Sequence, residues 1–226
     1  INRYGEMAPQ LTARHIWNWE RTKRALFLFL FGAMKKYAIA NLTAPTIAAV
    51  LDGNDPKLAG SMALLAILLY SLQQYADFSG GIDMVLGVAQ LYGIEMMPNF
   101  RQPYFSTSLG DFWRRWHITL GQWFQTYIYI PLGGNRTGTC KWIRNLLVVW
   151  ILTGIWHGTE FHFILWGFSL FVIVLTEKLL LKKLTDRYAL AGHLYMAVLI
   201  PLSWMLFGIS DPGSIEVYTL SLIHIS

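Results

Sequence analysis

The stretch Thr153-Gly154-Ile155-Trp156-His157-Gly158-Thr159 places a histidine at a turn between two apolar runs, residues 146–156 and 161–175. Titratable side chains are costly inside a bilayer, and they persist there where they line a cavity or take part in chemistry. His157 therefore has two interpretations at this point. It either ends a helix and hydrogen-bonds to a neighbour, or it belongs to a functional site.

The composition around this stretch is that of a membrane protein. Hydrophobic residues make up 54% of the 226 residues and charged residues only 14%, whereas about 25% of the residues in soluble domains are charged. The net charge of +5 is expected to orient the chain in the membrane. Nucleic-acid binding is not expected, because no basic patch stands apart from apolar sequence.

Five membrane-spanning helices are predicted, since lipid permits only helices or closed barrels and no segment alternates with the period of a strand. Their predicted ranges are 25–50, 58–75, 143–156, 161–181 and 190–209. Lys35 and Lys36 interrupt the first, and Pro201 is expected to kink the last. The prediction is an all-α, polytopic membrane domain over residues 1–226. Because the chain starts at Ile1 and residues 217–225 begin a further apolar segment, we expect a fragment of a longer protein.

Lysine and arginine are concentrated in alternate loops. They precede the first span, lie between the second and third spans, and lie between the fourth and fifth. The opposite loops, residues 52–57, 157–160 and 211–216, together hold five acidic residues and one lysine. Positively charged loops stay in the cytoplasm, so His157 is predicted to open toward the outside.

The region 76–141 is too polar for a series of spans and too aromatic for an ordinary loop. Apolar residues recur there at three- and four-residue spacing: Trp113, Trp116, Leu120, Trp123 and Tyr127. This spacing predicts one amphipathic helix that lies at the membrane interface or dips into it. Its aromatic residues form either an interfacial belt or the wall of a cavity.

Five motifs in order give the chain a family resemblance. They are Gln74-Tyr75-Ala76-Asp77, Pro98-Asn99-Phe100-Arg101-Gln102-Pro103-Tyr104, Phe112-Trp113-Arg114-Arg115-Trp116-His117-Ile118-Thr119-Leu120, Tyr129-Ile130-Pro131-Leu132-Gly133-Gly134-Asn135-Arg136 and Gly154-Ile155-Trp156-His157-Gly158. Together they closely resemble the membrane-bound O-acyltransferase family, in particular the bacterial branch with alginate O-acetyltransferase and the D-alanyl transfer protein of teichoic acid modification. Gln125-Thr126 stands where many relatives carry Arg-Asp.

The resemblance implies helices around a tunnel and an acyltransferase of the bacterial cytoplasmic membrane. An acyl group would pass from a cytoplasmic thioester to a glycan hydroxyl outside. The expected group is acetyl, and the alternative is D-alanyl. The implied donor is acetyl-CoA or an acyl carrier protein, with no bound cofactor. The implied acceptors are alginate-like exopolysaccharide, peptidoglycan or teichoic acid, with a secreted or membrane acetyltransferase as a further partner. His157 matches the family's catalytic histidine, and His117 matches a second polar position that faces it.

The residue types support this chemistry. Acyl transfer to a hydroxyl needs a base within hydrogen-bond reach, and imidazole is the usual choice, which suits His157. His117, or else the pair Arg114 and Arg115, would stabilise an oxyanion or bind the donor's phosphates, although adjacent arginines also serve as plain topology anchors.

Three further side chains are candidate contacts for donor or substrate: Trp116, Trp156 and Asp77. Asp77 follows the second predicted span and is expected either to orient a histidine or to pair with an arginine. We favour the pairing with arginine.

Other chemistries find less support in the sequence. It has neither a Gly-x-Ser-x-Gly nor a His-Glu-x-x-His motif, and its single cysteine, Cys140, gives no cysteine-rich site, so no metal is predicted. The alternative from another class is a transporter or channel in which His157 and His117 relay protons. No inverted repeat is visible to support it.

Overall fold

The computed structural model describes residues 1–51, 61–181, 185 and 187–208, and every regular element within them is a helix. The α-helices are α1 (Tyr4–Thr12), α2 (Trp19–Ala33), α3 (Asn41–Leu51), α4 (Ser61–Leu91), α5 (Leu109–Arg115), α6 (Ile118–Phe124), α7 (Thr139–His157), α8 (Phe161–Thr176) and α10 (Ala189–Gly208). Short π-helical segments are η1 (Met34–Ala40), η4 (Gln125–Tyr129) and η5 (Glu177–Leu181), and η3 (Pro103–Phe105) is a 3₁₀ turn. The predicted all-α class is confirmed.

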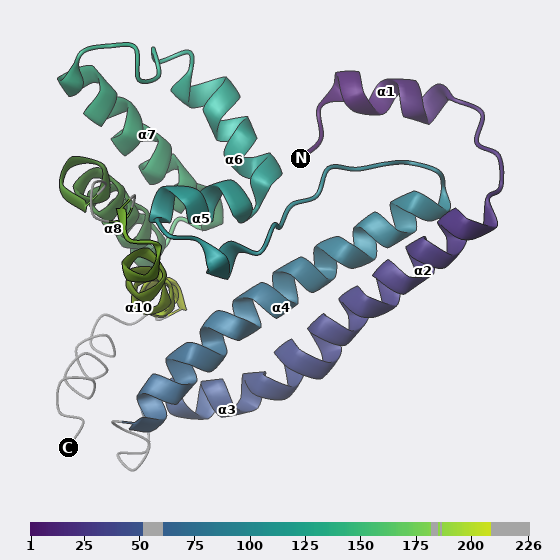
Figure 1. Cartoon of the computed structure of the whole chain (residues 1–226), viewed down its shortest axis with the longest axis horizontal. Coiled ribbons are helices and arrows are strands. Elements are labelled where there is room, and N and C mark those ends of the chain that lie inside the picture. The colour runs from purple at the N-terminus through teal and green to yellow at the C-terminus, as the bar shows by residue number, and fades with distance from the viewer. Residues whose placement is uncertain (52–60, 182–184, 186, 209–226) are drawn as a thin grey trace.

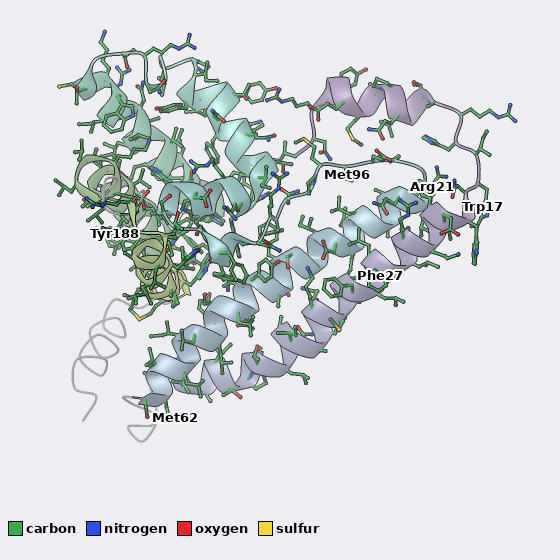
Figure 2. All side chains as sticks on the ribbon, in the orientation of Figure 1. Trp17, Arg21, Phe27, Met62, Met96 and Tyr188 are labelled. Carbon is green, nitrogen blue, oxygen red and sulfur yellow. The ribbon has the colours of Figure 1, made fainter. Side chains whose placement is uncertain are left out.

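The helices form two groups (Figure 1). In the first, α2, η1 and α3 follow one another and lie alongside the long helix α4. In the second, α5 to α8 and α10 pack together, and α10 also contacts α4. Many apolar side chains along α2, including that of Phe27, are exposed, as expected for residues that face lipid (Figure 2).

Small residues allow α2 and α4 to approach closely. A Cβ atom on Gly32 would lie 2.5 Å from the carbonyl oxygen of Gly80, and one on Gly87 would lie 2.7 Å from that of Ala25. Close contact of this kind is typical of small residues at helix interfaces in membranes. The glycines therefore set the spacing of the first group.

Both lysines that interrupt the first predicted span are paired with carboxylates of α4. Lys35 is buried, forms an ion pair with Asp83 and donates a 2.9 Å hydrogen bond to Ser79. Lys36 forms an ion pair with Asp77. The prediction that Asp77 pairs with an arginine is therefore wrong. Its true partner lies 41 residues away in the chain, which no local spacing reveals.

Among the described residues, three helices are long and apolar enough to cross a membrane: Trp19–Val50, Phe161–Leu181 and Ala189–Gly208. They correspond to the first, fourth and fifth predicted spans. The second predicted span lies within α4, which continues to Leu91, so residues 76–91 extend a helix instead of opening an interfacial region. The third lies within α7, which begins at Thr139. Residues 58–60 and 209, and the predicted loops 52–57 and 211–216, lie outside the described residues.

The single amphipathic helix predicted through Trp113 and Tyr127 is wrong. The chain breaks it between α5 and α6, where His117 adopts a left-handed backbone with φ of 43°. The break is held by the preceding loop: the carbonyl of Asn99 accepts from the N–H of Ile118 at 3.0 Å, and the N–H of Arg101 donates to the carbonyl of Arg115 at 2.9 Å. Left-handed backbone is uncommon for a residue other than glycine, and such residues gather at functional sites.

Candidate active site

His157 is the last residue of α7, and its ring is surrounded by aromatic rings. The ring centroids of its neighbours lie 5.0 to 6.4 Å from its own, and they belong to Trp156, Phe163, Trp166 and Phe207. Within the described part of the chain neither ring nitrogen of His157 has a hydrogen-bond partner. This arrangement argues against a histidine whose purpose is to hydrogen-bond a neighbour at a helix end.

Glycines explain why the chain can turn at this histidine. A Cβ atom on Gly154 would lie 2.5 Å from the carbonyl oxygen of Phe163, and one on Gly167 would lie 2.5 Å from that of Trp150. The backbones of α7 and α8 therefore touch along the hairpin, as glycine permits between helices in membranes. This contact fixes the end of α7, and with it His157, against α8.

His117 lies at the break between α5 and α6. Its Nδ1 lies 3.0 Å from the side-chain oxygen of the buried Asn99, and its ring meets that of Phe78 edge to face at 4.8 Å. Burial is the main cause that lowers the pKa of His117 to about 4, and the neighbouring His157 acts in the same direction. His117 is therefore neutral at physiological pH.

Trp156 connects the two histidines. Its ring centroid lies 6.0 Å from that of His117 and 5.0 Å from that of His157. The indole is 51% exposed. The structure thus brings together three of the predicted site residues from two separate segments, and we call His117, Trp156 and His157 the histidine site.

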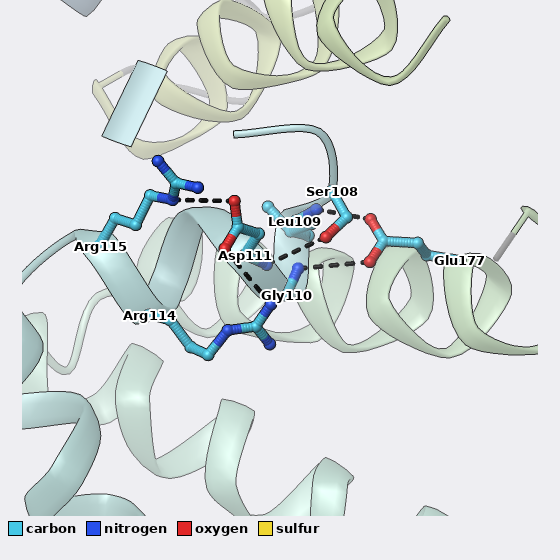
Figure 3. A network of polar contacts seen from close by, with 7 residues as sticks. All are labelled: Ser108, Leu109, Gly110, Asp111, Arg114, Arg115 and Glu177. Atoms are coloured by element: carbon cyan, nitrogen blue, oxygen red, sulfur yellow. Dashed lines mark hydrogen bonds and ion pairs between the residues drawn. The ribbon is translucent and has the colours of Figure 1, made fainter. Parts of the chain in front are cut away.

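The arginines of α5 make their polar contacts elsewhere (Figure 3). Arg114 Nη2 lies 3.3 Å and Arg115 Nε 2.8 Å from the carboxylate of Asp111. At the start of the same helix, the buried Glu177 accepts from the backbone N–H groups of Leu109 at 2.5 Å and Gly110 at 3.3 Å. A carboxylate at a helix N-terminus accepts hydrogen bonds from the free backbone N–H groups of the helix and interacts favourably with the helix dipole. Donor binding by the two arginines remains a prediction.

Trp116 is a core residue. It is 4% exposed, it stacks on Phe112 at 5.5 Å, and its ring centroid lies 5.0 Å from that of Phe100 and 4.9 Å from that of Trp204. These contacts join α5 to α10 and to the loop before η3. A role of Trp116 in binding substrate stays a prediction, as does one of Asp77, which pairs with Lys36.

Sequence reasoning missed the residues that surround the two histidines. Asn99 stands inside a quoted motif, yet nothing in the motif indicates that its side chain meets His117. Phe207 lies on α10 and reaches His157 only through tertiary packing. Across the residues that the structure describes, no group of three His, Cys, Asp or Glu side chains is placed to hold a metal ion.

Fold and site together define an all-helical membrane protein with a pair of histidines at the end of an apolar hairpin. The chain belongs to the membrane-bound O-acyltransferase family, MBOAT, whose family model matches residues 1–217. The predicted family is confirmed, and so is the prediction of a multi-pass protein of the bacterial cytoplasmic membrane.

Several curated bacterial proteins are similar to the chain. The probable alginate O-acetylase AlgI of Pseudomonas putida is 39% identical over 79% of this chain and 37% of its own length. The peptidoglycan O-acetyltransferase of Helicobacter pylori is 34% identical over 100% of this chain and 45% of its own length. The teichoic acid D-alanyltransferase of Bacillus subtilis is 34% identical over 63% of this chain and 35% of its own length. The chain thus spans less than half the length of these relatives.

Proposed function

We propose that the full-length protein is an O-acyltransferase that moves an acetyl group from a cytoplasmic thioester to a hydroxyl of a polysaccharide outside the membrane. The observation that carries the proposal is the histidine site in a chain of this family. His157 has no hydrogen-bond partner among the described residues, and Trp156 links it to His117. An imidazole free of internal partners is available to a substrate.

The residues suit a direct transfer. As the acceptor oxygen attacks the thioester carbonyl, His157 takes the hydroxyl proton, a carbon–oxygen bond forms and the carbon–sulfur bond breaks. The leaving thiolate then takes the proton from the imidazolium, so that His157 returns to its neutral form. The rings of Trp166 and Phe207 cover part of the ring of His157, and limited access of water would slow hydrolysis of the thioester.

Acetyl transfer is supported better than D-alanyl transfer. The relatives named for O-acetylation of alginate and of peptidoglycan match 79% and 100% of this chain, at 39% and 34% identity. Those named for D-alanylation of teichoic acid match 63% and 72%, at 34% and 26% identity. The donor is then acetyl-CoA or an acetylated carrier protein, and the acceptor is an exopolysaccharide such as alginate, or peptidoglycan. A separate acetyltransferase outside the membrane would be a partner in finishing the modification.

The test is transfer of labelled acetyl from acetyl-CoA or an acetylated carrier protein to glycan in membranes that contain the full-length protein. His157→Gln keeps a hydrogen-bonding side chain but cannot act as a base at neutral pH. We expect it to reach the membrane at normal abundance and to lose transfer by about 10²–10⁴-fold, the usual contribution of a general base. If His157→Gln transfers acetyl at nearly the wild-type rate, His157 is not the general base. If labelled acyl groups enter glycan only from a carrier protein charged with D-alanine, the transferred group is D-alanyl and not acetyl.

A further inference from the structure

Asn99 is a buried residue that organises the break at His117. Its side-chain oxygen lies 3.0 Å from Nδ1 of His117, 3.2 Å from the backbone nitrogen of Thr119 and 2.7 Å from the hydroxyl of Thr119. Its backbone carbonyl accepts from the N–H of Ile118 at 3.0 Å. One residue thus contacts three consecutive residues where α6 begins.

These contacts decide which ring nitrogen of His117 carries the hydrogen. The backbone N–H of Thr119 can only donate, so the side-chain atom of Asn99 that faces it must be the oxygen and not the amide nitrogen. An amide oxygen can only accept, and therefore Nδ1 of His117 must be the donor. A neutral imidazole has one N–H, which leaves Nε2 of His117 with a free lone pair.

Nε2 of His117 has no hydrogen-bond partner in the described residues, although the ring packs between Phe78 and Trp156. His117 is half-buried, so its free Nε2 can be reached by a donor from outside the chain. Burial favours the neutral form of this ring, and so does the neighbouring His157. A neutral ring with a bare Nε2 cannot donate to an oxyanion.

We infer that Asn99 is a positioning residue that fixes His117 as the Nδ1–H tautomer, so that Nε2 of His117 accepts a hydrogen bond from a neighbouring hydroxyl of the acceptor sugar, while the hydroxyl to be acylated gives its single hydrogen to His157. The substrate half of this inference rests on the proposed function, whereas the tautomer half rests on the contacts of Asn99 alone. It gives His117 a role in recognition of the acceptor and excludes both stabilisation of the oxyanion and binding of the donor's phosphates by Nε2, since a bare Nε2 has no hydrogen to donate.

The tautomer is tested first, in the wild-type full-length protein in detergent with ¹⁵N-labelled histidine. Nitrogen NMR distinguishes a protonated from a bare ring nitrogen, and the His117→Gln variant identifies the His117 signals by their disappearance. We expect a protonated Nδ1 and a bare Nε2 at neutral pH. A protonated Nε2, in either the other tautomer or the imidazolium, overturns the inference. This readout needs no turnover, so an absence of acyl transfer would count against the proposed function and not against the tautomer.

The role of Asn99 is tested by Asn99→Asp, which keeps the acceptor oxygen but adds a negative charge beside Nδ1. A carboxylate favours the imidazolium, so we expect the NMR titration midpoint of His117 to rise by about 1–3 pH units. Transfer by the variant should fall as the pH is lowered through this raised midpoint, at pH values where the wild type is still active, because Nε2 must be bare to accept the hydroxyl.

The matched control is Thr119→Val, which removes one contact of the same oxygen and leaves the backbone N–H in place. It should leave the tautomer and the titration midpoint of His117 unchanged. An unshifted midpoint in Asn99→Asp overturns the positioning role, and a shifted midpoint with transfer unaltered below that midpoint overturns the contact with the hydroxyl. If Asn99→Asp does not accumulate, the wild-type spectrum alone decides the tautomer.

Discussion

The two histidines of the site are held in different ways. His117 has a strained backbone, with φ of 43°, and a hydrogen bond that fixes one face of its ring. His157 has only ring contacts among the described residues, with Trp156, Phe163, Trp166 and Phe207. A fixed ring suits the orientation of a substrate, whereas a ring free of hydrogen bonds is able to exchange a proton without first breaking one.

This difference predicts unequal effects of removing each ring. In the full-length protein, His117→Ala should reduce acyl transfer by about 10²-fold, the loss that follows when a reactant is misplaced by about 1 Å, and some transfer should persist because His157 still acts as base. Quantitative transfer assays on membranes, normalised to protein abundance, measure the effect. Complete loss of transfer at normal abundance would assign the base to His117 instead.

Among the elements, the short helix α5 has its position set from outside. Its first turn is capped by Ser108 and by Glu177 of η5, and the residue that follows its last turn, Trp116, is enclosed by aromatic rings. Seven residues are too few for a stable helix in isolation. The capping and the packing therefore hold α5 in place, and α5 in turn carries the chain to His117.

Trp116→Ala should consequently lower the stability of the membrane protein. Burial of an aromatic side chain is worth roughly 1.5–3 kcal/mol, and its loss here leaves a cavity as well. Abundance in membranes and thermal unfolding in detergent measure the effect. The control is Tyr127→Ala, an exposed aromatic from the same predicted helix face, whose loss should change stability by about 0.5 kcal/mol or less. Normal abundance with lost transfer would place Trp116 in the site.

The elements also show which features the sequence can predict. Helical spans and the histidine turn follow from the length of apolar runs, which is a local property, and the helices α8 and α10 match their predicted ranges closely. The break at His117 depends on Asn99, which lies 18 residues away, and the partner of Asp77 lies 41 residues away. Contacts between distant residues leave no periodic trace, and for that reason the broken helix and the Lys36–Asp77 pair were not predicted.

At the scale of the whole molecule, α7 is the element whose direction matters. Its 19 residues span about 28 Å, close to the thickness of the hydrocarbon core. Cys140 lies at its beginning, in the basic region between the second and third predicted spans, and Thr159 follows its end beside His157. Both residues are exposed. If the basic loops are cytoplasmic, these two positions lie on opposite sides of the membrane.

Cysteine labelling in intact cells tests this orientation. In a full-length variant whose sole cysteine is Cys140, a thiol reagent that cannot cross the membrane should leave the protein unlabelled until the cells are opened. In the matched variant with Cys140→Ser and Thr159→Cys, the reagent should label intact cells, since the loop after His157 is predicted to face outside. Both variants should label equally after lysis, which controls for thiol reactivity. Labelling of Cys140 but not of the cysteine at position 159 in intact cells would reverse the orientation, and the glycan would then have to reach the histidine site from the opposite end of α7.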